Sequence, residues 1–211
     1  MGTRGKKILP VVSILAMGLG LGLLFASLFL IWHNNRESAD AGLVSNAANR
    51  AVSGAIGESP MAAYLSDPEF IPDYKLNPGM EMPEAEIDGR SYIGELSIPA
   101  LDLELPVQSE WSYANLKISP CRYTGTAYQG TFAICAHNYT THFGPIRNLE
   151  PGDGIFFTDM DGNAFTYSVH EVKEIPPSPD TQVTESGHDL VLFTCTLGGR
   201  TRVAVYCNAE S

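Results

Sequence analysis

The sequence contains no Asp, Glu, Lys or Arg between Ile8 and Trp32. An uncharged apolar stretch of this length is longer than the roughly 7–15 residues of a signal-peptide core, and it is long enough to cross a bilayer as a helix. Three basic residues precede the stretch, whereas only Arg36 follows it before the first acidic residue, which favours a cytoplasmic N-terminus. We therefore predict a cytoplasmic tail and a single-pass anchor in the cell membrane over residues 1–36. A signal peptide that is cleaved near residues 39–41 is the alternative.

Basic residues are scarce in the remainder of the chain. All 24 acidic residues but only 9 of the 13 basic residues follow Arg36, so this extracytoplasmic part carries a formal charge of −15. Such an acidic surface argues against nucleic acid as a partner and against an extended basic contact with anionic lipid headgroups. The membrane is therefore expected as a partner only through the N-terminal helix.

Cysteine is also infrequent, with four residues in the chain: Cys121, Cys135, Cys195 and Cys207. An even number in an exported protein permits disulfides without requiring them. If Cys195 stays a free thiol, at most one intramolecular pair can form, and Cys121 with Cys207 is a conceivable one. The alternative is that these two are small buried hydrophobic residues, and the sequence does not choose between the two possibilities.

Directly after the anchor, apolar residues recur at near-helical spacing at Ala39, Leu43, Ala47 and Ala51. An alanine-rich segment from Glu37 to Ile56 has the composition of a weak helix or a stalk, and five prolines recur between Gly57 and Glu86. Prolines at this density, without apolar periodicity, are typical of a linker or an extended arm. We predict an extracytoplasmic stalk and proline-rich linker over residues 37–86.

From Ile87 onward the pattern changes to short β-prone runs separated by turn signals such as Asp88-Gly89, Asp161-Gly162 and Gly198-Gly199. Strands this frequent, with few helical segments, predict an all-β domain over residues 87–211, either a barrel or a sandwich. The predicted strands are residues 91–98, 105–107, 131–136, 154–158, 164–175, 190–194 and 201–207.

The most informative segment is Phe193-Thr194-Cys195-Thr196, which closes an apolar strand ahead of a Gly-Gly turn. A thiol at a strand end is held rigidly and is still reachable, as a nucleophile must be. A second apolar strand, residues 131–136, ends in His137, and Arg200 and Arg202 follow the thiol. A thiolate, a proton donor and a cation for an oxyanion are what covalent acyl transfer requires. From the residues alone, a buried structural thiol is the competing interpretation of Cys195.

These segments resemble the sortase family, the membrane-anchored cysteine transpeptidases of Gram-positive bacteria. The stretch Val191-Leu192-Phe193-Thr194-Cys195 fits four of the five positions of the family's T-L-x-T-C signature, with Val191 in place of the first threonine. Ala136-His137-Asn138 matches the setting of the family's histidine, and residues 98–107 match its I-P-x-L-x-L-x-x-P-V strand. The resemblance covers residues 87–207 and suggests a class B- or D-like member.

The resemblance implies a closed eight-stranded β-barrel with short helices, preceded by the N-terminal transmembrane helix. It also implies cleavage of an LPxTG-like sorting signal in a surface protein or pilin, and transfer of the acyl group to an amine of a peptidoglycan precursor or pilin. No cofactor is expected. The expected catalytic residues are His137, Cys195 and Arg202, and the expected substrate-binding residues are Thr194, Thr196, Arg200 and Asn138.

Two of these assignments have competitors. Arg202 is preferred to Arg200 as the catalytic arginine because it directly precedes an apolar strand, whereas Arg200 belongs to a turn. The two share strand parity, so either could face the site. His137 is preferred to His142, which we expect on the loop over the site, because a strand end fixes a side chain better than a loop does.

No metal site is predicted, because a fourth ligand and a recognisable zinc framework are missing around the three nearest candidates, Cys135, His137 and His142. The run Asp159-Met160-Asp161-Gly162-Asn163 lacks two ligand positions of a calcium loop and is better explained as a hairpin turn. His170 alternates like an ordinary strand residue, and His188 lies in a polar turn.

Two further segments could lie near the substrate groove. Residues 66–70, Ser-Asp-Pro-Glu-Phe, resemble the aspartate-proline-aromatic lid of pilin-assembling sortases with the spacing off by one residue. An ordinary linker is the preferred interpretation. The loop of residues 176–189, just before the nucleophile strand, is expected to wall the substrate groove.

Two other functions stay open. One is a cysteine hydrolase of cell-wall peptides, although papain-like hydrolases usually place the cysteine first and at the start of a helix, whereas here the histidine comes first and both residues end strands. The other is a non-catalytic, membrane-anchored β domain that acts as a binding module. Such a module would keep its function after Cys195→Ala.

Overall fold

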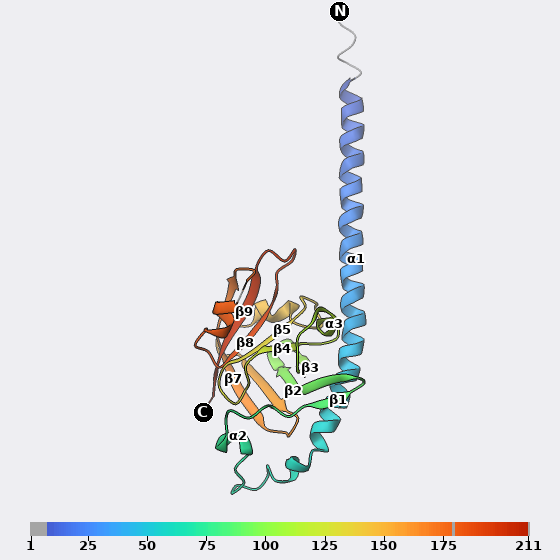
Figure 1. Ribbon diagram of the computed structural model, residues 1–211. Coiled ribbons are helices and arrows are strands. Elements are labelled where there is room, and N and C mark those ends of the chain that lie inside the picture. The colour runs from blue at the N-terminus through green and yellow to red at the C-terminus, as the bar shows by residue number, and fades with distance from the viewer. Residues whose placement is uncertain (1–7, 179, 211) are drawn as a thin grey trace, which may run out of the picture. The chain divides into compact units, whose positions relative to one another are not determined.

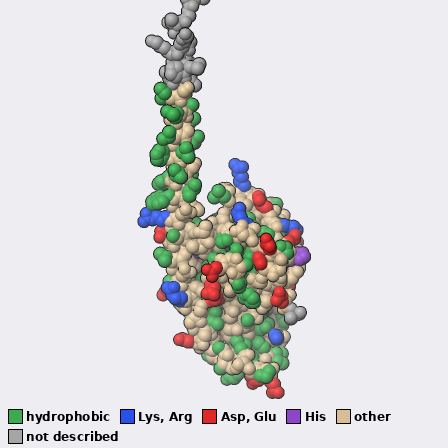
Figure 2. Space-filling model, turned by 180° about the vertical axis from the view of Figure 1, so that it is seen from behind, with side chains coloured by type: hydrophobic (Ala, Val, Ile, Leu, Met, Phe, Trp, Pro, Cys, Tyr) green, Lys and Arg blue, Asp and Glu red, His purple; other side chains and the backbone are tan. Residues whose placement is uncertain are grey.

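The computed structural model describes residues 8–178 and 180–210. A boundary after Glu37 divides the chain into two compact units, and helix α1 (Ile8–Gly57) contributes to both. In the first unit, hydrophobic side chains cover the helix (Figure 2). Ser13–Gly57 is long and apolar enough, with a mean hydropathy of 2.5 in its most apolar window, to be a candidate membrane span. The predicted basic tail before Ile8 lies outside the described residues.

The second unit contains a closed β-barrel (Figure 1). Its eight strands follow the order β2-β3-β4-β5-β8-β9-β7-β6, and β6 pairs with β2 to close the ring. This confirms the closed eight-stranded barrel, and a ninth short strand, β1, pairs only with β2. The strands are β1 (Ala85–Ile87), β2 (Arg90–Ile98), β3 (Leu103–Gln108), β4 (Cys121–Thr124), β5 (Phe132–Ala136), β6 (Gly154–Asp159), β7 (Ala164–Ile175), β8 (Leu190–Cys195) and β9 (Arg202–Ala209).

The barrel has short helices, as expected: four of them connect strands, and two, η1 and α2, precede β1. They are η1 (Pro60–Ala63), α2 (Asp73–Leu76), η2 (Pro99–Leu101), α3 (Tyr113–Leu116), η3 (Gly144–Asn148) and α4 (Asp180–Thr184). Two strands, β1 and β4, are missing from the sequence-based prediction. With three and four residues, they offer too few alternating positions for a pattern to be recognised.

Alternation along the strands divides the hydrophobic core into two layers. In β8, Leu190 and Leu192 belong to the large cluster to which strands all round the barrel contribute, whereas Val191 and Phe193 belong to a second cluster on the other face. We call this second face of β5, β8 and β9 the outer face. Phe193 precedes Cys195 by two residues, so the thiol is expected on the outer face.

Residues 38–57 are helical, which is one of the two forms that their composition predicts, and they pack on the barrel. Val52 is fully buried in a cluster with Tyr92 and Met160. Nearer the start of the unit, the Thr141 hydroxyl donates a hydrogen bond of 2.8 Å to the carbonyl of Ser38. The alanine-rich composition that favours a stalk also gives this helix a smooth surface that can approach the barrel closely.

The proline-rich segment that follows also contacts the barrel, as an arm. The ring of Tyr74 stacks on Tyr128 with centroids 4.7 Å apart, and it lies 5.2 Å from the ring of Phe165. Met82 is buried in the main core cluster. Isolated apolar side chains anchor this segment, and such contacts leave no periodic signal in the sequence.

The hairpin turn predicted at Asp161-Gly162 connects β6 to β7. Gly162 has a φ of +87°, which glycine adopts without strain. The buried carboxylate of Asp159 accepts hydrogen bonds from the backbone N–H groups of Asp161 and Asn163 and from the Tyr128 hydroxyl. The acidic residue therefore organises the turn, in agreement with the hairpin interpretation.

Candidate active site

Three neighbouring strands position the expected catalytic residues. β5 and β8 pair in parallel with Ala136 opposite Thr194, so His137 and Cys195 follow side by side at the same end of the sheet. β8 and β9 pair antiparallel with Cys195 opposite Arg202. Directly opposed residues carry their side chains on one face of a sheet. The thiol and the guanidinium therefore share the outer face.

A pocket of about 200 Å³ lies on this face. Four of the seven predicted site residues line it: His137, Thr194, Cys195 and Arg202. The other three, Asn138, Thr196 and Arg200, are absent from the lining that the described residues form. Cys195 is only half-buried, so the thiol is accessible from solvent. A partly exposed cysteine in a pocket with a histidine and an arginine has the composition of a nucleophile site.

The turn after Cys195 is closed by two threonines. The Thr196 N–H donates to the Thr201 carbonyl at 3.0 Å, and the Thr201 N–H donates to the Thr196 hydroxyl at 3.1 Å. Thr196, which the sequence assigns to the substrate, thus has its backbone N–H and hydroxyl engaged within the turn. Two glycines, Gly198 and Gly199, supply the positive φ values that the turn needs.

The same turn orients Arg202, the arginine that the sequence analysis prefers for catalysis. Nη1 of Arg202 donates hydrogen bonds to the carbonyls of Gly199 at 3.1 Å and Thr201 at 3.0 Å. Among the described residues these are its hydrogen bonds, and both use the same nitrogen, so the N–H groups on Nε and Nη2 can serve a substrate. Arg200, the competing arginine, is exposed in the turn.

Thr194 lines the pocket, but its hydroxyl has a structural partner. It is 2% exposed and donates a hydrogen bond of 2.8 Å to the Ala136 carbonyl. This bond joins β8 to β5 one residue before Cys195 and His137. The hydroxyl of Thr194, a residue that we expected to bind substrate, therefore links the ends of the two strands.

His142 is fully buried, whereas the sequence places it on a loop over the site. Its ring lies 5.4 Å from that of Tyr139, which in turn lies 4.9 Å from the ring of His137. Burial first, and then the neighbouring His137, lower the pKa of His142 to about 4. The backbone of Ile118, near the ring but outside hydrogen-bond geometry, opposes this shift only in part. A buried neutral imidazole is poorly suited to protonate a leaving group, so His142 does not compete with His137 for this expected role.

All four cysteines are free thiols, so the conceivable Cys121–Cys207 disulfide is absent. Burial raises the pKa values of Cys121 and Cys207 to about 12, and it also raises that of Cys135. These three thiols are held protonated in the interior. Cys135 lines the pocket beside His137, as their shared strand parity predicts, but its burial makes it part of the wall.

The apolar wall of the pocket comes mostly from the segment between β3 and β5, which includes α3 and β4 and for which the sequence predicts no role. Trp111, Tyr113 and Tyr123 line the pocket together with Leu116, and Trp111 and Tyr113 are exposed. The available signal in the sequence was the spacing of the two aromatic residues, two positions apart, because aromatic side chains are enriched at binding surfaces. Pro177 also lines the pocket, in agreement with the expected role of the loop 176–189. The lid-like residues 66–70 do not contribute to the lining.

Comparison with known proteins gives one family. The family model described as "Sortase domain" matches residues 96–210. Sortase A of Bacillus anthracis is 31% identical over 135 residues, which are 60% of this chain and 64% of that protein. Sortase A of Listeria monocytogenes is 28% identical over 118 residues, 53% of this chain and 52% of that protein. The chain thus spans less than two thirds of the length of these relatives.

Solved structures agree in fold. Sortase A from Corynebacterium diphtheriae, a lid mutant, superposes with a TM-score of 0.52 at 25% identity, covering 79% of this chain and 96% of that one. The Clostridium perfringens sortase D5 transpeptidase gives 0.52 at 22% identity, covering 68% and 91%. The pilus-related sortase C of Group B Streptococcus gives 0.51 at 21% identity, covering 67% and 79%. The matches include class D, one of the two classes that the sequence suggests, together with classes A and C.

Proposed function

The chain belongs to the sortase family, and from this premise we propose that it is a cysteine transpeptidase that cleaves an LPxTG-like sorting signal. The observation that carries the proposal is the single pocket lined by Cys195, His137 and Arg202. The three side chains come from the ends of three adjacent strands. Sites built on regular strands hold catalytic groups more accurately than sites on loops.

In the first half-reaction, the thiolate of Cys195 attacks the carbonyl carbon of the threonine in the signal. A C–S bond forms, and the carbonyl oxygen becomes an oxyanion to which Nε or Nη2 of Arg202 donates. Arginine suits this task because it keeps its charge and offers several donors in a fixed plane. The C–N bond to the glycine then breaks, and His137 protonates the departing amine.

In the second half-reaction, an amine attacks the resulting thioester. His137 accepts a proton from this amine, an amide bond forms, and Cys195 leaves as the thiolate. If water attacks the thioester in place of the amine, the enzyme releases a free carboxylic acid. This is the reaction of the hydrolase alternative. The choice between the two depends on which nucleophile reaches the thioester.

The apolar wall supports a peptide with hydrophobic residues before the scissile bond. Trp111, Leu116, Tyr123 and Phe193 form a surface of this kind next to the thiol. Clefts with apolar walls and a few convergent polar groups are typical of ligand sites. We assign this wall to the leucine and proline of the signal.

A second groove supports an amine as the acceptor. It has a volume of about 510 Å³ and shares Trp111 and Tyr123 with the catalytic pocket. The carboxylates of Glu81 and Glu110 line it. We assign this groove to the amine of a peptidoglycan precursor or a pilin, because negative charge attracts a protonated amine.

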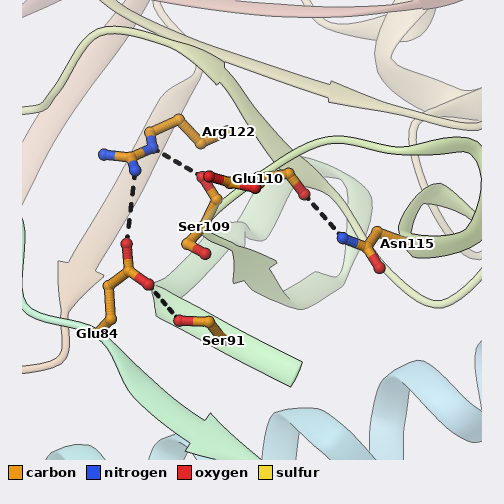
Figure 3. A network of polar contacts seen from close by, with 6 residues as sticks. All are labelled: Glu84, Ser91, Ser109, Glu110, Asn115 and Arg122. Carbon is orange, nitrogen blue, oxygen red and sulfur yellow. Dashed lines mark hydrogen bonds and ion pairs between the residues drawn. The ribbon is translucent and has the colours of Figure 1, made fainter. Parts of the chain in front are cut away.

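The only basic residue in the lining of this groove, as far as the described residues form it, is Arg122. Its Nη2 lies 3.5 Å from the carboxylate of Glu84, and its Nε donates to the Ser109 carbonyl at 2.8 Å (Figure 3). A carboxylate from outside the groove thus offsets the charge of Arg122. The charges of Glu81 and Glu110 therefore make the groove negative, which favours binding of a protonated amine.

For the location, we propose a single-pass protein of the cell membrane with the barrel on the extracytoplasmic side. The candidate span in α1 supports this topology, as does the excess of basic residues before it. Substrates that carry sorting signals and cell-wall amines are found on that side of the membrane.

The test uses the full chain in detergent, a quenched library of LPxTG-like peptides, and mass spectrometry with and without amines such as triglycine or diaminopimelate. A thioacyl adduct on Cys195 that an amine converts to an amide establishes a transpeptidase. Release of the free acid at the same rate with and without amine identifies a hydrolase. If Cys195 forms no adduct and also resists small alkylating reagents, the binding module replaces both enzyme assignments.

A further inference from the structure

A second cluster of possible ligands lies on the barrel away from the pocket. It consists of His170 and Glu171 in β7 and His188 in the turn before β8, and one ligand atom from each lies within 4.8 Å of the others. The ring of His188 lies 5.2 Å from that of Tyr206. Tyr206 follows Arg202 by four residues along β9, a separation of about 13 Å. The cluster therefore shares the outer face with the catalytic pocket without sharing any lining residue.

A β-bulge brings the first two residues together. His170 and Glu171 are consecutive, and in a regular strand their side chains would point to opposite faces. The register between β7 and β9 shifts at this place, with Val169 opposite Cys207 and Glu171 opposite Tyr206. His170 is the extra residue of the bulge, and such bulges re-aim side chains. The imidazole of His170 and the carboxylate of Glu171 can therefore bind the same ion.

The third residue is oriented by a neighbour. Nδ1 of His188 lies 2.8 Å from Oδ1 of Asn208. An amide oxygen accepts hydrogen bonds, so Nδ1 is the ring nitrogen that donates here, and Nε2 is the one left for a ligand. Histidines that bind metals are usually held in this way by an oxygen acceptor on the other ring nitrogen. The contact with Asn208 thus holds the ring in an orientation that leaves Nε2 available to a metal.

From this geometry we propose that His170, Glu171 and His188 bind a divalent transition-metal ion, with zinc as the first candidate. Two imidazoles and one carboxylate suit zinc, copper or nickel, whereas calcium and magnesium prefer oxygen ligands. A tetrahedral zinc site has ligand atoms about 3.3 Å apart. The side chains are exposed or half-buried, so small rotations can close the present separation. Water completes the coordination.

Lys173 is the charged group that competes with the metal. Its Nζ lies 2.5 Å from Oε1 of Glu171 and 5.9 Å from the centroid of the Tyr206 ring. A bound cation must displace this ammonium group from Oε1 or use the other carboxylate oxygen. Removing the positive charge at position 173 should therefore tighten binding of the metal.

The test measures zinc binding by equilibrium dialysis and cobalt binding by visible absorption, on the full chain in detergent without a polyhistidine tag. All proteins carry Cys195→Ala, because this half-buried thiol could itself bind zinc, whereas the other three thiols are buried. The variants are His170→Ala, His188→Ala, Asn208→Ala and Lys173→Gln. His33→Ala is the matched control, since His33 also lies beside a carboxylate, 3.6 Å from Glu37, but is part of no cluster of three possible ligands among the described residues.

We expect one equivalent of zinc at micromolar concentrations and a tetrahedral cobalt spectrum. His170→Ala or His188→Ala should weaken binding by at least about tenfold, and Asn208→Ala by about 10-fold to 100-fold, as is usual for groups that orient ligands. Lys173→Gln should tighten binding, and His33→Ala should change nothing. The proposal fails if the parent binds no stoichiometric zinc, or if both histidine variants bind it as tightly as the parent. Thermal melts without metal show whether each variant is folded.

Discussion

Cys195 and Arg202 stand directly opposite each other where the β8–β9 hairpin enters its turn. The hydrogen bonds between Thr196 and Thr201 close that turn, and they set the register that makes the two residues partners. Arg200, only two residues earlier, is exposed in the turn and belongs to no pocket wall near the thiol. Strand register therefore selects one of two closely spaced arginines.

This pairing predicts different effects of two arginine substitutions. Arg202→Ala should lower kcat/KM for a sorting-signal peptide by about 10²-fold to 10³-fold, the usual effect of removing an oxyanion donor. Arg200→Ala should change it by less than about threefold, since an exposed surface substitution has little effect. Peptide cleavage kinetics measure both. Equal losses in the two variants would contradict the assignment of Arg202.

Burial of His142 predicts a dependence of stability on acid. Above the unfolded-state pKa of 6.5, the imidazole is neutral in both states and has no effect. As the pH falls from 6.5 toward about 4, the unfolded chain binds a proton that the folded protein does not, so the free energy of unfolding decreases. The loss attributable to this residue should be on the order of 3 kcal/mol near pH 4.

Urea unfolding of residues 38–211 between pH 4 and pH 7 measures this loss. His142→Leu should flatten the decrease, whereas His170→Leu, at an exposed site, should leave its slope close to that of the parent. If the His142 variant keeps the full decrease, other groups cause it and the imidazole is not responsible.

The hydrogen bond between Thr194 and Ala136 predicts a cost in stability and in rate. Thr194→Val keeps the shape of the side chain but removes the donor, and it should destabilise the fold by about 1–3 kcal/mol. Because the bond joins the strands that end in His137 and Cys195, the peptide cleavage rate should also fall. Thr181→Val, on the exposed surface of α4, is the control and should affect neither quantity. Unfolding by urea and peptide cleavage test both effects.

Packing of residues 38–57 on the barrel predicts that this helix stabilises the second unit. Val52→Ala removes two fully buried methyl groups and should lower the free energy of unfolding by about 1–2 kcal/mol. Val44→Ala, on the same helix at a position that is 47% exposed, should change it by less than about 0.5 kcal/mol. A stalk that does not contact the barrel would instead give two equal, small effects in denaturant titrations.

The sequence predicts the strands of the site well, because long apolar runs with β-branched residues have a clear period. Six of the seven predicted strands begin and end within two residues of β2, β3, β5, β6, β8 and β9, and the span of residues 164–175 matches β7. The position of Cys195 and His137 at strand ends follows from these runs alone. The sequence does not predict β4, nor the aromatic wall from Trp111 to Tyr123, since these segments are short and aperiodic.

The environments of the histidines depend on tertiary structure and do not follow from the local sequence. His142 follows His137 by five residues, yet the chain buries one ring and leaves the other at the pocket. His170 and His188 are eighteen positions apart and meet through a bulge that no periodicity indicates. Whether an imidazole faces solvent, a pocket or the core depends on how the loop around it folds.

The sequence by itself determined the apolar span near the N-terminus, the β-rich domain, and a thiol and an imidazole at the ends of buried strands. These are local properties, set by hydrophobicity and by the alternation of side chains along each strand. Only the tertiary structure decided that β5, β8 and β9 are neighbours, that Arg202 faces Cys195, and that residues 38–86 lie against the barrel. These depend on register and packing between segments far apart in the chain, whose free energies arise from contacts that no single segment contains.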